Sequence, residues 1–240
     1  MRMLSFAALI SVTMAKKENQ ELLENPEALK EKLAGAEHWI EDNPKIVFSI
    51  LGALVLIVGG FFGYRYWVGS QDNQAQKDMF QAVRYFEADS LNLALNGDGN
   101  NLGFLSIIDD YSMTPAGKLA NFYVGSIYLK QGKFKPAILY LEDFNSDDLL
   151  VQARTYSLIG DCHMELKEFE DAAKFYTKAA EYKPNKFFSP TYWMKAALAY
   201  EKLNQPAKAR EVYDQVIEKY WDSNESQNAR RYKAKLNTNS

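Results

Sequence analysis

The chain has 240 residues, of which 47% are hydrophobic and 25% charged, proportions that are ordinary for a folded domain with additional segments. A net charge of −3 without a basic stripe argues against a nucleic-acid-binding protein. Cys162 is the single cysteine, so no intrachain disulfide can form, which fits a reducing compartment and equally an exported helical domain.

Residues 1–45 read as a polar tail with one short amphipathic helix. Residues 1–13 are apolar apart from one arginine and could be a short signal peptide, although we favour a natural start at Met14. Asn25 and Pro26 can cap and begin a helix that ends near residue 43. Its apolar residues recur at helical spacing, at Leu29, Leu33, Ala36 and Ile40. This helix could lie on a membrane surface or be solvated with a modest contact face.

Residues 46–68 are predicted to form a transmembrane helix. The 19 residues from Ile46 to Tyr64 carry no charge. As a helix they would span about 28 Å, close to the hydrocarbon thickness of a bilayer. Tyr64, Tyr66 and Trp67 would form an aromatic belt at the headgroup layer. The alternative is a buried helix of a globular protein, and the length, the belt and the polar flanks argue against it.

Three glycines fall on one face of this predicted span, at Gly52, Gly59 and Gly63. Small residues let a second helix approach closely, and Gly59 and Gly63 have the spacing of a dimerisation motif. We therefore expect this face to pack against a partner helix, although glycine is common in membrane helices in any case.

Lysines before the predicted span outnumber the basic residues that closely follow it. The five that precede it are Lys16, Lys17, Lys30, Lys32 and Lys45. This bias predicts a cytoplasmic N-terminus, with the C-terminal region across the membrane in a bacterial periplasm or its equivalent.

Residues 69–240 are predicted to fold as a helical domain. A helix over residues 71–87 comes first and could continue directly from the span. Residues 96–101 are a strong turn signal, and a further helix is expected over residues 102–111.

From residue 118 a pattern of large and small residues returns about every 35 residues. Its three units cover residues 118–151, 153–186 and 190–223. The second unit shows it most fully, at Tyr156, Gly160, Phe169, Ala172, Tyr176, Ala179 and Pro184. This order resembles the tetratricopeptide repeat (TPR), a helical hairpin of about 34 residues. The predicted fold is therefore all-α: a single N-terminal transmembrane helix followed by an α-solenoid of TPR hairpins, with a capping helix over residues 226–236.

Small residues are expected where the two helices of each hairpin touch. The first helix supplies Gly125, Gly160 or Ala197, and the facing helix supplies Ala137, Ala172 or Ala209. The turn between the helices is expected at Gly132, Lys167 or Asn204. Glycine and asparagine tolerate a left-handed backbone, and Lys167 is an ordinary variation.

The chain offers little for catalysis. Cys162 and His163 are adjacent on a helix and point about 100° apart, which does not make a nucleophile and its base. One cysteine and two separated histidines cannot supply a zinc site without several carboxylates. The acidic pairs at residues 109–110 and 147–148 are read as solvated or capping, and residues 96–99 as a turn instead of a calcium loop. We predict no catalytic residue, no cofactor, no metal and no small-molecule substrate.

The repeats should instead present a groove to a protein partner, lined by the first helix of each hairpin. Its predicted lining residues are Leu119, Phe122, Ser126, Leu129, Arg154, Ser157, Asp161, Met164, Thr191, Met194, Leu198 and Glu201. This mixed, largely apolar surface suits an unfolded or amphipathic segment. The alternative is that the helix over residues 71–87 covers it. The lysines and asparagines with which TPR domains clamp a terminal carboxylate are missing.

Two further segments extend the likeness to a known family. His38-Trp39-Ile40 precedes the span, and Gly63-Tyr64-Arg65-Tyr66-Trp67 ends it. With the helical hairpins, this arrangement over roughly residues 35–220 resembles the YfgM family, the ancillary subunit of the bacterial SecYEG translocon. The chain differs in its cleaner repeats and longer tail.

The resemblance implies a single-pass inner-membrane protein with a periplasmic TPR domain. It also implies SecYEG and a membrane-anchored chaperone of the PpiD type as partners, and a role in passing exported chains onward. A scaffold of another envelope complex, such as outer-membrane or cell-wall machinery, is the first alternative. A regulator or an enzyme with an unrecognised site is the second.

Overall fold

The computed structural model describes residues 26–238, and every regular element in this range is a helix, apart from an isolated β-bridge between Gly97 and Leu102. The predicted all-α class is confirmed. The chain divides into two units, residues 1–65 and 66–240, which are taken in turn. The candidate signal sequence, residues 1–13, lies outside the described residues.

The first unit contains α2 (Pro26–Asp42) and the beginning of α3 (Pro44–Glu87). Ile40 of α2 is exposed, and the side chains of the other three predicted apolar positions lie outside the description. In the described part of the chain, α3 is the one helix long and apolar enough to cross a membrane. The side chains of Val55, Leu56 and Ile57 are 70%, 77% and 69% exposed. The described protein therefore leaves this apolar surface uncovered.

The second unit begins with a helical layer formed by the end of α3, α4 (Leu91–Asn96), α5 (Phe104–Tyr111) and α6 (Pro115–Lys130). Their buried side chains form one cluster, in which Met79 of α3 packs with Phe104 and Ile107 of α5 and with Val124 of α6. The ring of Tyr123 stacks on Phe104 at 4.7 Å between centroids. This cluster fixes α3 from residue 75 onward against the first repeat.

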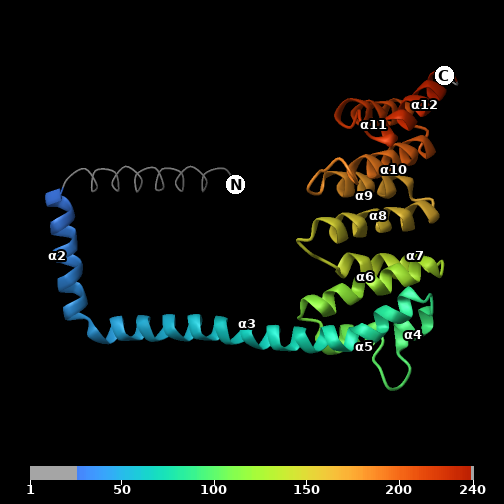
Figure 1. The fold of residues 1–240 in the computed structure, drawn as a ribbon. Helices are drawn as coiled ribbons and strands as arrows, with labels where there is room; N and C mark the ends of the chain where they lie inside the picture. The colour runs from blue at the N-terminus through green and yellow to red at the C-terminus, as the bar shows by residue number, and fades with distance from the viewer. Residues whose placement is uncertain (1–25, 239–240) are drawn as a thin grey trace. The chain divides into compact units, whose positions relative to one another are not determined.

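Three helical hairpins and a final helix follow, and they stack in chain order (Figure 1). The hairpins are α6 with α7 (Phe134–Asp143), α8 (Leu149–Glu165) with α9 (Phe169–Glu181), and α10 (Ser189–Lys202) with α11 (Pro206–Lys219). The final helix is α12 (Asn224–Thr238). Adjacent helices along the chain contact one another, as in a solenoid.

Two of the hairpins close over a glycine, as the sequence pattern predicts. A Cβ placed on Gly125 would lie 2.5 Å from Cγ of Leu141, and one on Gly160 would lie 2.7 Å from the ring of Tyr176. Real Cβ atoms do not approach that closely, so only glycine allows these helices their separation.

The hairpin turns use a left-handed residue at all three predicted positions. The φ angles are 71° at Gly132, 63° at Lys167 and 56° at Asn204. A lysine in this conformation brings its Cβ close to the following carbonyl oxygen, which costs roughly 1–2 kcal/mol. Lys167 is therefore more than a neutral variation, and it strains the turn between α8 and α9.

Replacing Lys167 with glycine is expected to stabilise the repeat domain by about 0.5–1 kcal/mol, because glycine adopts a positive φ freely but gains freedom in the unfolded chain. Urea unfolding followed by circular dichroism measures the change. Lys174→Gly, in the exposed middle of α9, serves as the control and should destabilise by about 1 kcal/mol. A loss of stability in both variants would contradict the strained-turn account.

Candidate partner-binding surface

The first repeat presents little of its predicted lining to a partner. Leu119 packs against the cluster shared with α3, whereas Phe122 and Leu129 pack against the core between α7 and α8. The Ser126 hydroxyl donates to the carbonyl oxygen of Phe122 at 2.7 Å, within its own helix. These four side chains are partly buried, so most of their surface packs within the domain and little of it is available to a partner.

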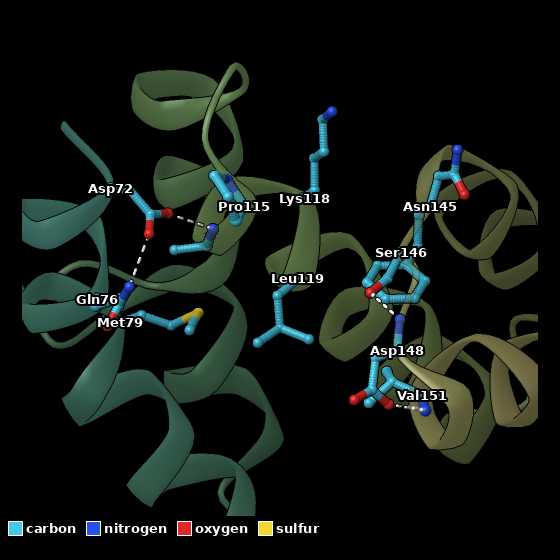
Figure 2. Close-up of a pocket in the computed structure, with 12 residues that line it drawn as sticks. Asp72, Gln76, Met79, Pro115, Lys118, Leu119, Asn145, Ser146, Asp148 and Val151 are labelled. Atoms are coloured by element: carbon cyan, nitrogen blue, oxygen red, sulfur yellow. Dashed lines mark hydrogen bonds between the residues drawn. The ribbon is translucent and has the colours of Figure 1, made fainter. Parts of the chain in front are cut away.

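Leu119 also borders a hollow of about 600 Å³ between the end of α3, α6 and the loop before α8. Figure 2 shows its side chain between Met79 on one side and the segment around Ser146 on the other. Asp72 of α3 accepts the backbone N–H of Ala116 at 2.7 Å, which caps the start of α6. The helix expected to cover the groove therefore forms one wall at the first repeat and leaves a hollow beside it.

The second repeat holds an ion-pair network at its predicted lining positions. The Lys195 ammonium of α10 donates to both carboxylate oxygens of Asp161, at 2.8 and 2.9 Å, and to the Ser157 hydroxyl at 3.1 Å. The Tyr176 hydroxyl donates to the same carboxylate at 2.7 Å. Ser157 is only 2% exposed, and Arg154 is the exposed member of this set. Asp161 thus joins two repeats and is not an open contact residue.

The third repeat carries the most accessible part of the predicted surface. Its predicted residues come together in a hollow of about 380 Å³ that α12 closes on one side. This α10–α12 hollow is lined by Thr191, Met194, Lys195, Leu198, Glu201, Tyr213, Glu225, Asn228 and Tyr232. Leu198 is 45% exposed and Tyr232 50% exposed, so apolar surface remains open here.

Hydroxyl groups hold both carboxylates of the α10–α12 hollow. The Tyr213 hydroxyl donates to Glu201 at 2.5 Å, and the Thr191 hydroxyl donates to Glu225 at 2.8 Å. Burial, and then the bond to Glu201, raises the pKa of Tyr213 well above its ordinary value. Tyr213 therefore stays protonated and remains a donor to Glu201 across physiological pH.

The potential nucleophile and its neighbour have structural roles. Burial, with the nearby charge of Asp161, raises the pKa of the Cys162 thiol to about 12, so the thiolate is scarcely populated at neutral pH. His163 stacks on Phe175 of α9 at 5.4 Å between ring centroids, so its ring packs between the two helices of the hairpin. Its other ring contact is to Glu168.

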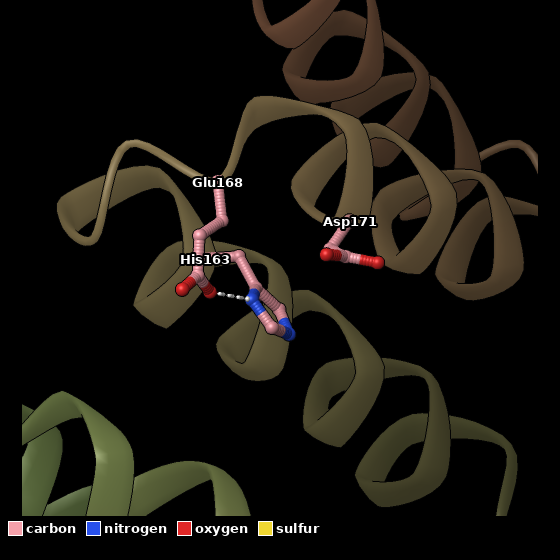
Figure 3. A group of neighbouring side chains, drawn as sticks. All are labelled: His163, Glu168 and Asp171. Carbon is pink, nitrogen blue, oxygen red and sulfur yellow. Dashed lines mark hydrogen bonds and ion pairs between the residues drawn. The ribbon is translucent and has the colours of Figure 1, made fainter.

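His163, Glu168 and Asp171 form a small polar cluster at the turn between α8 and α9 (Figure 3). Nδ1 of His163 lies 2.7 Å from a carboxylate oxygen of Glu168. His163 lies in the last turn of α8 and Glu168 directly precedes α9, so this bond links the two helices of one hairpin. The contact is accounted for by closure of the turn.

The turn over residues 96–101 is also held by its own side chains. The Asp98 carboxylate accepts the Tyr85 hydroxyl at 2.6 Å and the backbone N–H groups of Asn100 and Asn101 at 2.9 and 2.7 Å. These bonds, first that from Tyr85, hold the pKa of Asp98 well below its usual range. The acidic pairs behave as expected in part, because Asp148 caps α8 through the N–H groups of Leu150 and Val151.

Comparison with known proteins agrees with this architecture. Models of the tetratricopeptide repeat match residues 153–186 and 192–223. The chain carries tetratricopeptide repeats. They coincide with the α8–α9 and α10–α11 hairpins, and such repeats indicate a scaffold for protein–protein interaction. A comparison with curated protein sequences found no match.

Solved structures show the same fold. A crystal structure of nearly identical TPR-like repeats from Podosopora anserina superposes with a TM-score of 0.53 at 11% identity. The superposition covers 69% of this chain and 86% of the Podosopora anserina chain. A point variant of that protein gives a TM-score of 0.53 at 12% identity, over 69% and 85%. At such identities the likeness concerns the TPR-like fold alone.

The TPR pattern by itself did not identify Lys195 of α10 or the residues contributed by α12. Lys195 lies beside the predicted lining position Met194, and it faces the preceding repeat. Glu225 and Tyr232 belong to the C-terminal helix α12. This helix was predicted as a cap of the solenoid, and no binding role was predicted for it. A lysine on the corresponding helix one repeat after Asp161 was the available signal for the first of these.

Proposed function

We propose that the protein is a non-enzymatic, membrane-anchored TPR adaptor that brings protein partners together at a membrane. The observation that carries the anchor is the uncovered apolar surface of α3, whose most apolar 18 residues are 0% buried. Such a surface is costly in water and favourable in a bilayer. The two matched repeats support the adaptor role.

The finer proposal is an ancillary subunit of the SecYEG translocon in the bacterial inner membrane, with a PpiD-like periplasmic chaperone as a second partner. The YfgM-like sequence at the end of the span supports it. The excess of lysines before the span supports a cytoplasmic N-terminus and a periplasmic repeat domain. Association with another envelope complex is the competing proposal.

Purification of the tagged full-length protein from its native membrane in mild detergent, with mass spectrometry of the recovered proteins, tests this proposal. Recovery of SecY together with a periplasmic isomerase-like chaperone is the expected result. Recovery of outer-membrane-assembly or cell-wall components in their place would support the competing scaffold. Recovery of a small-molecule-processing complex alone would contradict both.

The glycine face of α3 is the proposed contact with a partner helix. A Cβ placed on Gly52, Gly59 or Gly63 meets no described atom within 4 Å, so no segment within residues 26–238 uses the close approach that the glycines allow. Close helix packing in a membrane depends on such small residues.

Replacing Gly59 and Gly63 with leucine is expected to lower recovery of the partner roughly fivefold while the repeat domain stays folded. Gly60→Leu is the matched control, since a leucine at position 60 would point about 100° away from a leucine at position 59. Quantitative mass spectrometry of the three purifications measures the difference. Equal losses in the control and the double variant would remove the glycine face from the proposal.

A further inference from the structure

We propose that the α10–α12 hollow binds a protein segment in which an apolar side chain is flanked by basic ones. This inference deepens the proposed adaptor function and rests on it, because it names the kind of segment that the repeats would hold. It is carried by the order of side chains along α10 and by the balance of charge in the hollow.

The hollow has an acidic group at each end and apolar groups between them. Thr191, Met194, Leu198 and Glu201 follow one another at steps of three and four residues along α10, and therefore share one helical face. Glu225 reaches the first end through its bond with Thr191. From position 191 to position 201 the helix rises about 15 Å. Along α10, the surface therefore has an acidic group at each end, Glu225 and Glu201, and two apolar side chains, Met194 and Leu198, between them.

The charge of the hollow is negative because its one cation is already paired. Among the lining residues, Lys195 alone is basic, and both oxygens of Asp161 in the preceding repeat hold its ammonium. Glu201 and Glu225 each accept a neutral hydroxyl, and no ion pair within the described residues includes either. Arg231 of α12 donates to Asn228 and does not line the hollow.

Two carboxylates that are partly desolvated and lack a cation favour a ligand that supplies one. The exposed side chains of Leu198 and Tyr232 favour an apolar group between the cations. In an extended segment, alternate side chains share a face and lie about 6.6 Å apart. Two basic residues four positions apart, with an apolar residue midway, would therefore lie about 13 Å apart. This spacing is close to the length of the hollow, and a lysine side chain is long enough to make up the difference.

Fluorescence anisotropy with the full-length protein in detergent micelles tests the inference. The probe is a labelled, N-acetylated peptide with the sequence Lys-Ser-Leu-Ser-Lys. Its controls are Glu-Ser-Leu-Ser-Glu, which reverses the charge, and Lys-Ser-Ser-Ser-Lys, which removes the apolar group. We expect the probe to bind at least about tenfold more tightly than either control, since the first control loses both ion pairs and the second loses the buried apolar side chain.

Variants of the protein locate the binding. Glu201→Gln and Glu225→Gln keep an oxygen that can accept the Tyr213 or Thr191 hydroxyl but remove the charge. Each is expected to weaken probe binding about three- to fivefold, and Leu198→Ser about fivefold. Glu211→Gln, at an exposed position of α11 outside the hollow, should leave the affinity unchanged. Unchanged thermal unfolding of the glutamine variants shows that the fold is kept.

Three results would overturn the inference: equal binding of the charge-reversed peptide, no binding of the probe, or no effect of the two glutamine variants. If an unacetylated peptide without the two lysines bound more tightly than the probe, a chain terminus would supply the cation. The flanking basic residues of the inference would then be wrong. Recovery of partners from the membrane separates this inference from the adaptor function. Partners that co-purify equally well with the double glutamine variant would contradict the inference and leave the adaptor proposal standing.

Discussion

Replacing Gly160 with leucine is expected to lower the free energy of unfolding of the repeat domain by about 3 kcal/mol. Even a Cβ at this position would lie 2.7 Å from the Tyr176 ring. That ring cannot move aside cheaply, because its hydroxyl donates to Asp161, which also holds Lys195 of the next repeat. The added side chain would therefore separate α8 from α9 and disturb the contact with α10.

Urea unfolding of the full-length protein in micelles, followed at 222 nm, measures this loss. Arg154→Leu adds a leucine at an exposed position of the same helix and should change stability by less than about 0.5 kcal/mol. If Gly160→Leu were as harmless as this control, the close approach of α8 and α9 would be wrong.

Placing lysines at the middle of the predicted span is expected to release the protein from the membrane. Val55 is the central residue of the uncharged stretch, and Val55 and Val58 are both exposed in the described protein. A lysine at the centre of a membrane helix costs about 2.5–3.5 kcal/mol, so the double variant Val55→Lys, Val58→Lys should insert poorly.

Sodium carbonate washing of membranes followed by immunoblotting measures the distribution of the protein. The parent chain should stay in the pellet, and most of the lysine variant should appear in the supernatant. Val55→Leu with Val58→Leu is the control and should stay in the pellet. A lysine variant that remained membrane-bound to the same extent would contradict an anchor formed by α3.

The repeat pattern predicted the hairpins because the contact between two close helices requires a small residue at a fixed place. Gly125 and Gly160 could be read as contact residues before their neighbours were known, and the left-handed turns followed from the same spacing. By contrast, α4 was not predicted. Its six residues are too few to show a helical period, and a strong turn signal follows directly.

The lining of the groove was harder to predict than the hairpins. Repeat spacing assigns a side chain to a face of its own helix, but it does not say what the next repeat places against that face. Ser157 and Asp161 were predicted as open positions, and Lys195 of the following repeat occupies both. Glu201 and Leu198 remain accessible because the neighbour there is α12, whose polar surface leaves the hollow open.

The most direct test of a membrane adaptor that holds its partner on the repeats is photocrosslinking in the native membrane. A photoreactive amino acid is placed at Leu198 in the α10–α12 hollow and, in a second variant, at Glu211 on the exposed side of α11. The account predicts a discrete adduct of the full-length protein with one or two membrane or envelope proteins from position 198, and none from position 211. Equal labelling from both positions, or no adduct from either, would contradict it.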